Sequence, residues 1–259
     1  MWLVEDADTR IYLLGTMHAL PAGTAWDGGK VGEAIGAADE LMLELSPQQL
    51  AVVDDAFEEL APRSAPLAMS ARLPAKDLAG YRAIEGDADF GGDALDDWAV
   101  LVLMGQQVAR RAELSPAAGV EAGLTAAFRK AEKPIRGLES AKMQLMLFET
   151  LDPKTQRALL VRAAANSARS EKDVLAMAAA WSRGDVDALE KVVNEDVDAV
   201  PAARKAIITD RNRRWSAWAA QRMNRPGTVL MAVGAGHLVG TDGVPAMLAA
   251  QGFKVSRIQ

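Results

Sequence analysis

Residues 10–18, Arg-Ile-Tyr-Leu-Leu-Gly-Thr-Met-His, carry an apolar run that leads directly into a Gly-x-x-His motif. Near the other end of the chain, residues 228–237, Thr-Val-Leu-Met-Ala-Val-Gly-Ala-Gly-His, repeat this arrangement. Short apolar runs that end at glycine are typical of buried β-strands. His18 and His237 are the only two histidines of the chain. Because each follows a predicted strand and a glycine, we expect the two ends of the chain to meet in one site.

The alternation of strands and helices along the chain predicts an α/β fold. Apolar runs at residues 2–4 and 10–14, joined by a polar turn, predict a β-hairpin. Further strands are predicted at residues 40–45, 134–139, 228–233 and 253–258. Helical periodicity predicts helices at residues 30–38, 47–60, 75–83, 95–113, 120–131, 141–151, 153–167, 170–183, 185–193, 202–223 and 237–251.

The distribution of these elements predicts a single domain with a mixed sheet built from the N- and C-terminal segments. Its core is expected to comprise residues 1–65 and 226–259 together with the strand near 134–139. A large helical insertion is expected over roughly residues 66–225, where helical periodicity dominates. The length of 259 residues lies near the upper limit for one hydrophobic core.

Composition excludes several classes of function. The net charge of −6, with no basic tract, disfavours binding to nucleic acid or to an anionic membrane. The absence of cysteine excludes a disulfide framework, a thiolate nucleophile and a zinc–thiolate site. No apolar run approaches the roughly 18 residues of a transmembrane helix.

The N-terminal residues do not predict a compartment. They include acidic side chains from Glu5 onward and lack the basic region of a signal peptide. We therefore expect either a cytoplasmic protein or an exported one whose signal has been removed. The oligomeric state is left open as well.

Four polar residues are expected beyond the carboxyl ends of strands, where open α/β sheets bind their ligands. These residues are His18, Glu44, Glu139 and His237. Imidazole and carboxylate together suit Mn²⁺, Co²⁺ or Zn²⁺, so the sequence predicts a divalent ion held by His18, Glu44 and His237. Such an ion lowers the pKa of a bound water to about 7, and a nearby carboxylate then acts as general base.

The predicted helix 202–223 contributes two further candidates. Arg211 is expected to reach the site as an oxyanion clamp, and Asn212 as a hydrogen-bond donor. The alternative is an exposed basic face above an apolar stripe, since Arg211, Trp215 and Trp218 share one face of this helix.

Two acidic residues have a second interpretation. Glu139 precedes a predicted helix and Glu121 begins one, so either can be explained by the favourable interaction of a carboxylate with a helix N-terminus. We include Glu139 among the predicted site residues, and leave Glu121 undecided between the two roles.

The ordered motifs of the chain resemble those of the TraB/GumN family, which includes the animal Tiki proteins. The residues that carry this resemblance are 11–18, 43–44, 119–121, 137–140, 211–212 and 233–240. The resemblance implies an α/β core with a helical insertion, related to erythromycin esterases and to a haem-binding lipoprotein group. It further implies a metal-dependent protease using Mn²⁺ or Co²⁺, and, for bacterial relatives, frequent export.

Carried over to this chain, the resemblance implies that His18 and His237 lie at the centre of the site. Glu44 would be a ligand or base, and Arg211 and Asn212 site residues. We therefore predict a metal-dependent hydrolase, specifically a peptidase, acting on a peptide or small molecule. The alternatives are an esterase-like hydrolase without metal, with histidine as base, and a non-catalytic protein that binds iron or haem.

Overall fold

A computed structural model describes residues 1–259, the whole chain. Its centre is a six-stranded mixed sheet with the strand order β6-β4-β7-β2-β1-β8. The strands are β1 (Trp2–Glu5), β2 (Thr9–Thr16), β4 (Glu40–Leu45), β6 (Ile135–Glu139), β7 (Gly227–Gly234) and β8 (Val255–Arg257). The first four strands of this order, β6, β4, β7 and β2, are parallel, and β1 runs antiparallel to β2 and β8. The predicted α/β class, with a sheet formed by both ends of the chain, is confirmed.

The two histidine motifs leave the sheet side by side. Strands β2 and β7 are adjacent and parallel, and their register pairs Gly15 with Val233 and Thr16 with Gly234. Each strand therefore ends at the same edge of the sheet, and the motif that follows it starts from that edge. The two similar motifs therefore lie close together in space, because parallel pairing places corresponding parts of the two strands next to each other.

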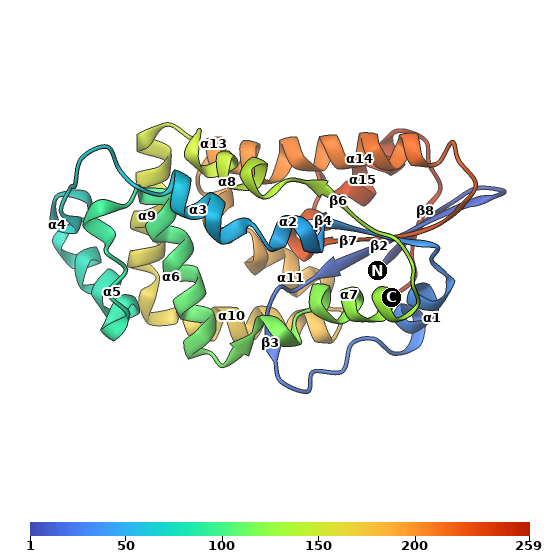
Figure 1. Ribbon diagram of the computed structural model, residues 1–259, viewed down its shortest axis with the longest axis horizontal. Helices are drawn as coiled ribbons and strands as arrows, with labels where there is room; N and C mark the ends of the chain where they lie inside the picture. The colour runs from blue at the N-terminus through green and yellow to red at the C-terminus, as the bar shows by residue number, and fades with distance from the viewer.

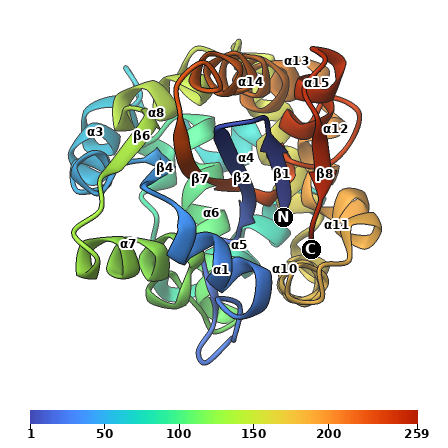
Figure 2. The same cartoon turned by 90° about the vertical axis from the view of Figure 1, so that its right-hand side faces the viewer.

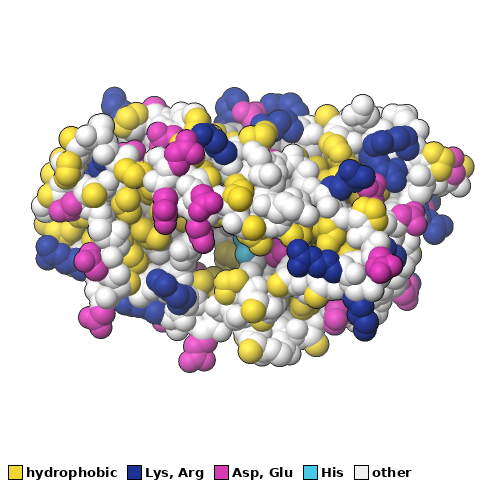
Figure 3. Space-filling model, in the orientation of Figure 1, with side chains coloured by type: hydrophobic (Ala, Val, Ile, Leu, Met, Phe, Trp, Pro, Cys, Tyr) yellow, Lys and Arg dark blue, Asp and Glu magenta, His cyan; other side chains and the backbone are white.

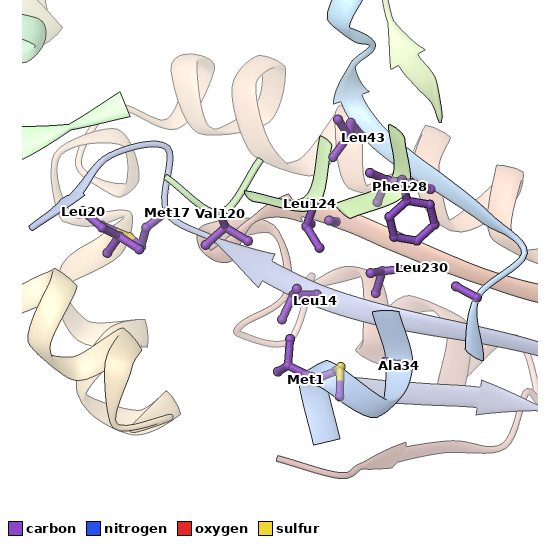
Figure 4. Close-up of a cluster of buried hydrophobic side chains, with 14 of the residues drawn as sticks. Met1, Leu14, Met17, Leu20, Ala34, Leu43, Val120, Leu124, Phe128 and Leu230 are labelled. Carbon is purple, nitrogen blue, oxygen red and sulfur yellow. The ribbon is translucent and has the colours of Figure 1, made fainter. Parts of the chain in front are cut away.

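Helices cover both faces of the sheet (Figure 2). One face packs against α14 (Asp210–Arg222) and α15 (Val244–Ala250). The other packs against α1 (Gly29–Ala37), α7 (Val120–Lys130) and α10 (Ser167–Ser182). Figure 4 shows this second core, where Leu14 and Leu230 of the sheet meet Leu124 and Phe128 of α7. Apolar residues on both sides explain why β2 and β7 read as continuous apolar runs.

A second group of helices lies beyond the edge of the sheet from which both motifs leave (Figure 1). Here α5 (Ala75–Glu85), α6 (Asp97–Arg111) and α9 (Pro153–Ala165) pack around their own apolar cluster. The remaining elements are α2 (Pro47–Leu50), α3 (Val53–Leu60), α4 (Met69–Arg72), α8 (Ala141–Glu149), α11 (Val186–Val193), α12 (Glu195–Asp198), α13 (Pro201–Arg204), β3 (Leu20–Pro21) and β5 (Leu114–Ser115). No helix combines the length and apolar character needed to cross a bilayer.

Three predicted helices differ from the structure. The helix expected over 47–60 is interrupted between α2 and α3, at residues 51–52. The helix expected over 202–223 contains a π-helical turn at Lys205–Thr209. The helix expected over 237–251 begins only at Val244, because His237 ends a 3-10 turn and Gly240 has a φ of +79°. That left-handed backbone ends helical continuity and suits glycine.

Candidate active site

The structure brings all six predicted site residues together at the carboxyl edge of the sheet, and the guanidinium of Arg211 contacts three of the others. Its Nη2 donates to Glu44 Oε2 at 2.5 Å and to Glu139 Oε2 at 2.7 Å. Its Nε donates to Glu139 Oε1 at 3.1 Å, and its Nη1 lies 3.0 Å from His237 Nε2. Arg211, Glu44 and Glu139 are all buried. Its single positive charge is therefore shared by two buried carboxylates, and Arg214 provides a second cation 3.4 Å from Glu139.

His237 is held in one tautomer by its two neighbours on α14. Because a guanidinium only donates, Nε2 accepts from Arg211, and the Nδ1 hydrogen must then point to Asn212 Oδ1, 2.7 Å away. Asn212 Nδ2 donates to the carbonyl of Asp242 at 2.8 Å, which fixes the orientation of the amide. Burial lowers the pKa of His237 to about 3, with Arg211 adding to the effect. His237 is therefore neutral at physiological pH.

Arg211 and Asn212 both reach the site although adjacent helical residues point about 100° apart. They do so because they bind opposite nitrogens of one imidazole. The π-helical turn ends just before them, a feature often found at functional sites. The guanidinium also lies over the ring of Trp215, 4.5 Å from its centroid, and that ring is 4.5 Å from the imidazole of His237. The alternative of an exposed basic face is therefore wrong for Arg211.

His18 differs from His237 in being exposed. Its side chain retains 72% of its accessible surface, and Figure 3 shows a histidine at the floor of a hollow in this face of the molecule. His18 Nδ1 lies 2.7 Å from Glu121 Oε1, which also accepts from Thr16 Oγ1 at 2.5 Å. The hydrogen bond to the carboxylate of Glu121 raises the pKa of His18 to about 9. Burial opposes ionisation of Glu121, but its bonds to His18 and Thr16 hold its pKa below the usual value.

The segment Gly119-Val120-Glu121 fastens the first histidine motif to α7. The Val120 amide donates to the carbonyl of Met17 at 3.1 Å. A Cβ on Gly119 would lie only 2.1 Å from the carbonyl oxygen of His18, so glycine alone permits this approach. Glu121, which the sequence left undecided, therefore belongs to the site.

Gly234 lies among the three residues predicted as metal ligands. Its amide donates to Glu44 Oε1 at 2.7 Å. A Cβ at this position would stand 3.2 Å from that oxygen, 3.6 Å from His237 Cδ2 and 3.9 Å from His18 Nε2. The absence of a side chain here leaves space between the exposed imidazole and the carboxylate of Glu44.

Most of the lone pairs that a metal ion would need are already used. Glu44 Oε1 binds the Gly234 amide, and Oε2 binds Arg211 and Gln144 Nε2. Both nitrogens of His237 are engaged, and no group of three or more histidine, aspartate or glutamate side chains has a metal-binding arrangement. Arg211 would also repel a divalent cation placed between Glu44 and His237. The predicted ion held by His18, Glu44 and His237 does not fit these side chains.

Comparison with known protein families identifies the family of this chain. The sequence profile of the TraB/PrgY/gumN family matches residues 1–257. The chain belongs to the TraB/PrgY/gumN family. No curated protein and no solved structure matches it.

Two residues that support the site of this TraB/PrgY/gumN chain were not predicted from the sequence. Asn194 Nδ2 donates to the carbonyl of Gly236 at 2.9 Å, and a Cβ on Gly236 would lie 2.5 Å from Asn194 Oδ1. Gln144 on α8 donates to Glu44 Oε2 at 2.9 Å. Both come from the helical stretch and belong to no recognisable motif. Only the packing of that stretch against the sheet edge places them at the site.

Proposed function

We propose that this member of the TraB/PrgY/gumN family is a hydrolase that cleaves an amide or ester bond without a resident metal ion. The observation that carries the proposal is the pairing of His18 and Glu121. Its imidazole is exposed, with Nδ1 bound by a carboxylate and Nε2 close to Gly234. A base held by a third group in this way is the usual arrangement for activating a nucleophile.

His18 provides the proton transfers of this reaction. Because its pKa is about 9, His18 is largely protonated near pH 7, and the reaction uses the smaller neutral fraction. In that neutral form, Nε2 takes a proton from a water molecule as the water oxygen bonds to the substrate carbonyl carbon. The π electrons of the carbonyl move onto its oxygen. When the tetrahedral intermediate collapses, the bond to the leaving nitrogen or oxygen breaks, and His18 Nε2 returns the proton to that atom. The products are a carboxylic acid and an amine or alcohol.

Glu44 supports this cycle as a fixed negative charge. Burial favours its neutral form, but the charge of Arg211, together with that of His18 and the hydrogen bond from the Gly234 amide, outweighs that effect and lowers its pKa to about 2. The carboxylate therefore stays ionised, and its attraction stabilises the imidazolium that forms at His18. Arg211 acts here by positioning Glu44, since its contacts are made to Glu44, Glu139 and His237.

The proposal is tested by hydrolysis assays with a fluorogenic peptide mixture and p-nitrophenyl esters. We expect turnover of at least one class by the wild-type protein, its loss in His18→Ala with the circular dichroism spectrum retained, and no change with a chelator. Since His18 is exposed, its replacement should not disrupt packing.

Two outcomes would overturn the proposal. Turnover that requires added Mn²⁺ or Co²⁺ would favour the metal-dependent peptidase instead. A Soret band on haem titration, with turnover no greater than that of His18→Ala, would favour a non-catalytic haem-binding protein.

A further inference from the structure

A second cavity lies behind the histidine motifs, on the side of the sheet covered by α1 and α10. Its volume is about 590 Å³, a size typical of small-molecule sites. It is bounded by the loop before α1, the end of α10 and the start of α11. Gly15 and Ala235, one from each histidine motif, form part of its wall, whereas His18, Glu44 and Arg211 do not line it. The cavity is therefore separate from the proposed catalytic site.

The lining of this cavity is apolar and aromatic. Eleven of its nineteen lining residues are hydrophobic, and these include Trp2, Trp26 and Trp181, three of the six tryptophans of the chain. Trp181 is anchored because its Nε1 donates to the carbonyl of Gly15 at 2.8 Å. Indole walls of this kind provide a large apolar contact area with little conformational freedom to lose on binding.

The charged side chains of the lining all have one sign, and the two chain ends, the Met1 amine and Gln259, bond to each other there at 2.8 Å. Arg183 and Arg257 line the cavity, and no aspartate or glutamate does. The sign of these side chains is opposite to that of the whole chain, which has 35 acidic and 29 basic residues. Arg183 is exposed at the end of α10. Arg257 is held in place by donating from Nη2 to the carbonyl of Gly184 and from Nε to Gln259 at 3.1 Å, which leaves Nη1 for a ligand. Clefts lined by one sign of charge attract ligands of the opposite sign.

We propose that this cavity binds an organic carboxylate with an apolar body. The carboxylate lies beside Arg183 and Arg257, and the apolar body lies against the three tryptophans. An anion with a large polar surface, such as a free sugar phosphate, would leave the indole walls uncovered. Both a straight acyl chain and a fused aromatic ring fit this chemistry, and the experiment distinguishes them.

The test is calorimetric titration of the full chain with decanoate, kept below its micelle-forming concentration, and with 2-naphthoate. Decanol is the uncharged control. We expect saturable binding of one carboxylate, accompanied by a change in tryptophan fluorescence, and weaker binding of decanol. The carboxylate that binds more tightly identifies the body that the cavity prefers.

Two variants address the two halves of the proposal. Arg183→Glu replaces an attraction by a repulsion and should weaken carboxylate binding about tenfold, given the usual strength of exposed ion pairs. Arg213→Glu, on the exposed surface of α14, is the matched control and should bind as the wild type does. Ser182→Phe, at an exposed lining position, should obstruct the cavity and abolish binding of either ligand.

The proposal is overturned if neither carboxylate binds saturably, or if decanol binds as tightly as decanoate. It is also overturned if Arg183→Glu and Arg213→Glu bind alike. His18→Ala should retain full carboxylate binding, so this result does not depend on whether the chain is a hydrolase.

Discussion

Replacing Glu121 by glutamine should lower the pKa of His18 without moving its ring. The carboxylate of Glu121, 2.7 Å from Nδ1, is the main reason that this pKa is raised from 6.5 to about 9. A glutamine oxygen can still accept from Nδ1, so the substitution removes the charge and retains the hydrogen bond. The desolvation that opposes protonation remains. The pKa of His18 in Glu121→Gln should therefore fall from about 9 toward its ordinary value of 6.5.

Imidazole NMR signals measure this shift without a substrate. The chain has only two histidines, so two sets of signals are expected, and His18→Ala assigns them. In the wild type, one should titrate near pH 9 and the other, from His237, should stay neutral to about pH 3. Glu33→Gln, at an exposed position on α1, is the matched control and should leave both unchanged. The reasoning is refuted if His18 titrates at the same pH in the wild type and in Glu121→Gln.

Three further predictions concern activity, stability and pH. Gly234→Ala should fold normally, since the φ of −47° at this position suits alanine. Its hydrolysis rate should fall about tenfold or more, because the methyl group enters the space beside His18. Full activity would contradict this prediction. Arg211→Met removes the cation beside buried Glu44 and leaves buried Glu139 with only the 3.4 Å contact to Arg214. It should lower the urea-derived free energy of unfolding by about 3–5 kcal/mol, against about 0.5 kcal/mol or less for the exposed Arg213→Met. Between pH 6.5 and 3, the unfolded chain protonates His237 and the folded protein does not. The free energy of unfolding should therefore decrease as the pH is lowered through this range. The same dependence of the unfolding free energy on pH in His237→Gln would exclude this cause.

The strand-end residues were predictable because their pattern is local. An apolar run followed by Gly-x-x-His indicates a strand that ends at a loop, and parallel pairing of β2 with β7 then brings His18 and His237 to one edge. Glu44 and Glu139 follow the same logic on β4 and β6, which are also parallel. Proximity was therefore accessible from the sequence.

The roles of these residues were not predictable in the same way. Whether Arg211 faces a substrate or two carboxylates depends on the position of α14 relative to the strand ends, over 70 residues away along the chain from Glu139. In addition, the residue type alone does not distinguish the two histidines. Their difference arises from surroundings, since one is exposed beside Glu121 and the other is buried beside Arg211 and Asn212.

By itself the sequence determined the α/β class, the family and the set of polar residues at the sheet edge, because hydrophobic periodicity and short motifs are properties of neighbouring positions. Only the tertiary structure decided which of those polar groups bind one another and which remain open to solvent. Hydrogen bonds and ion pairs are satisfied between segments far apart in the chain, and burial sets the pKa of each group. The same imidazole is consequently a neutral, fixed ring at His237 and an exposed proton carrier at His18.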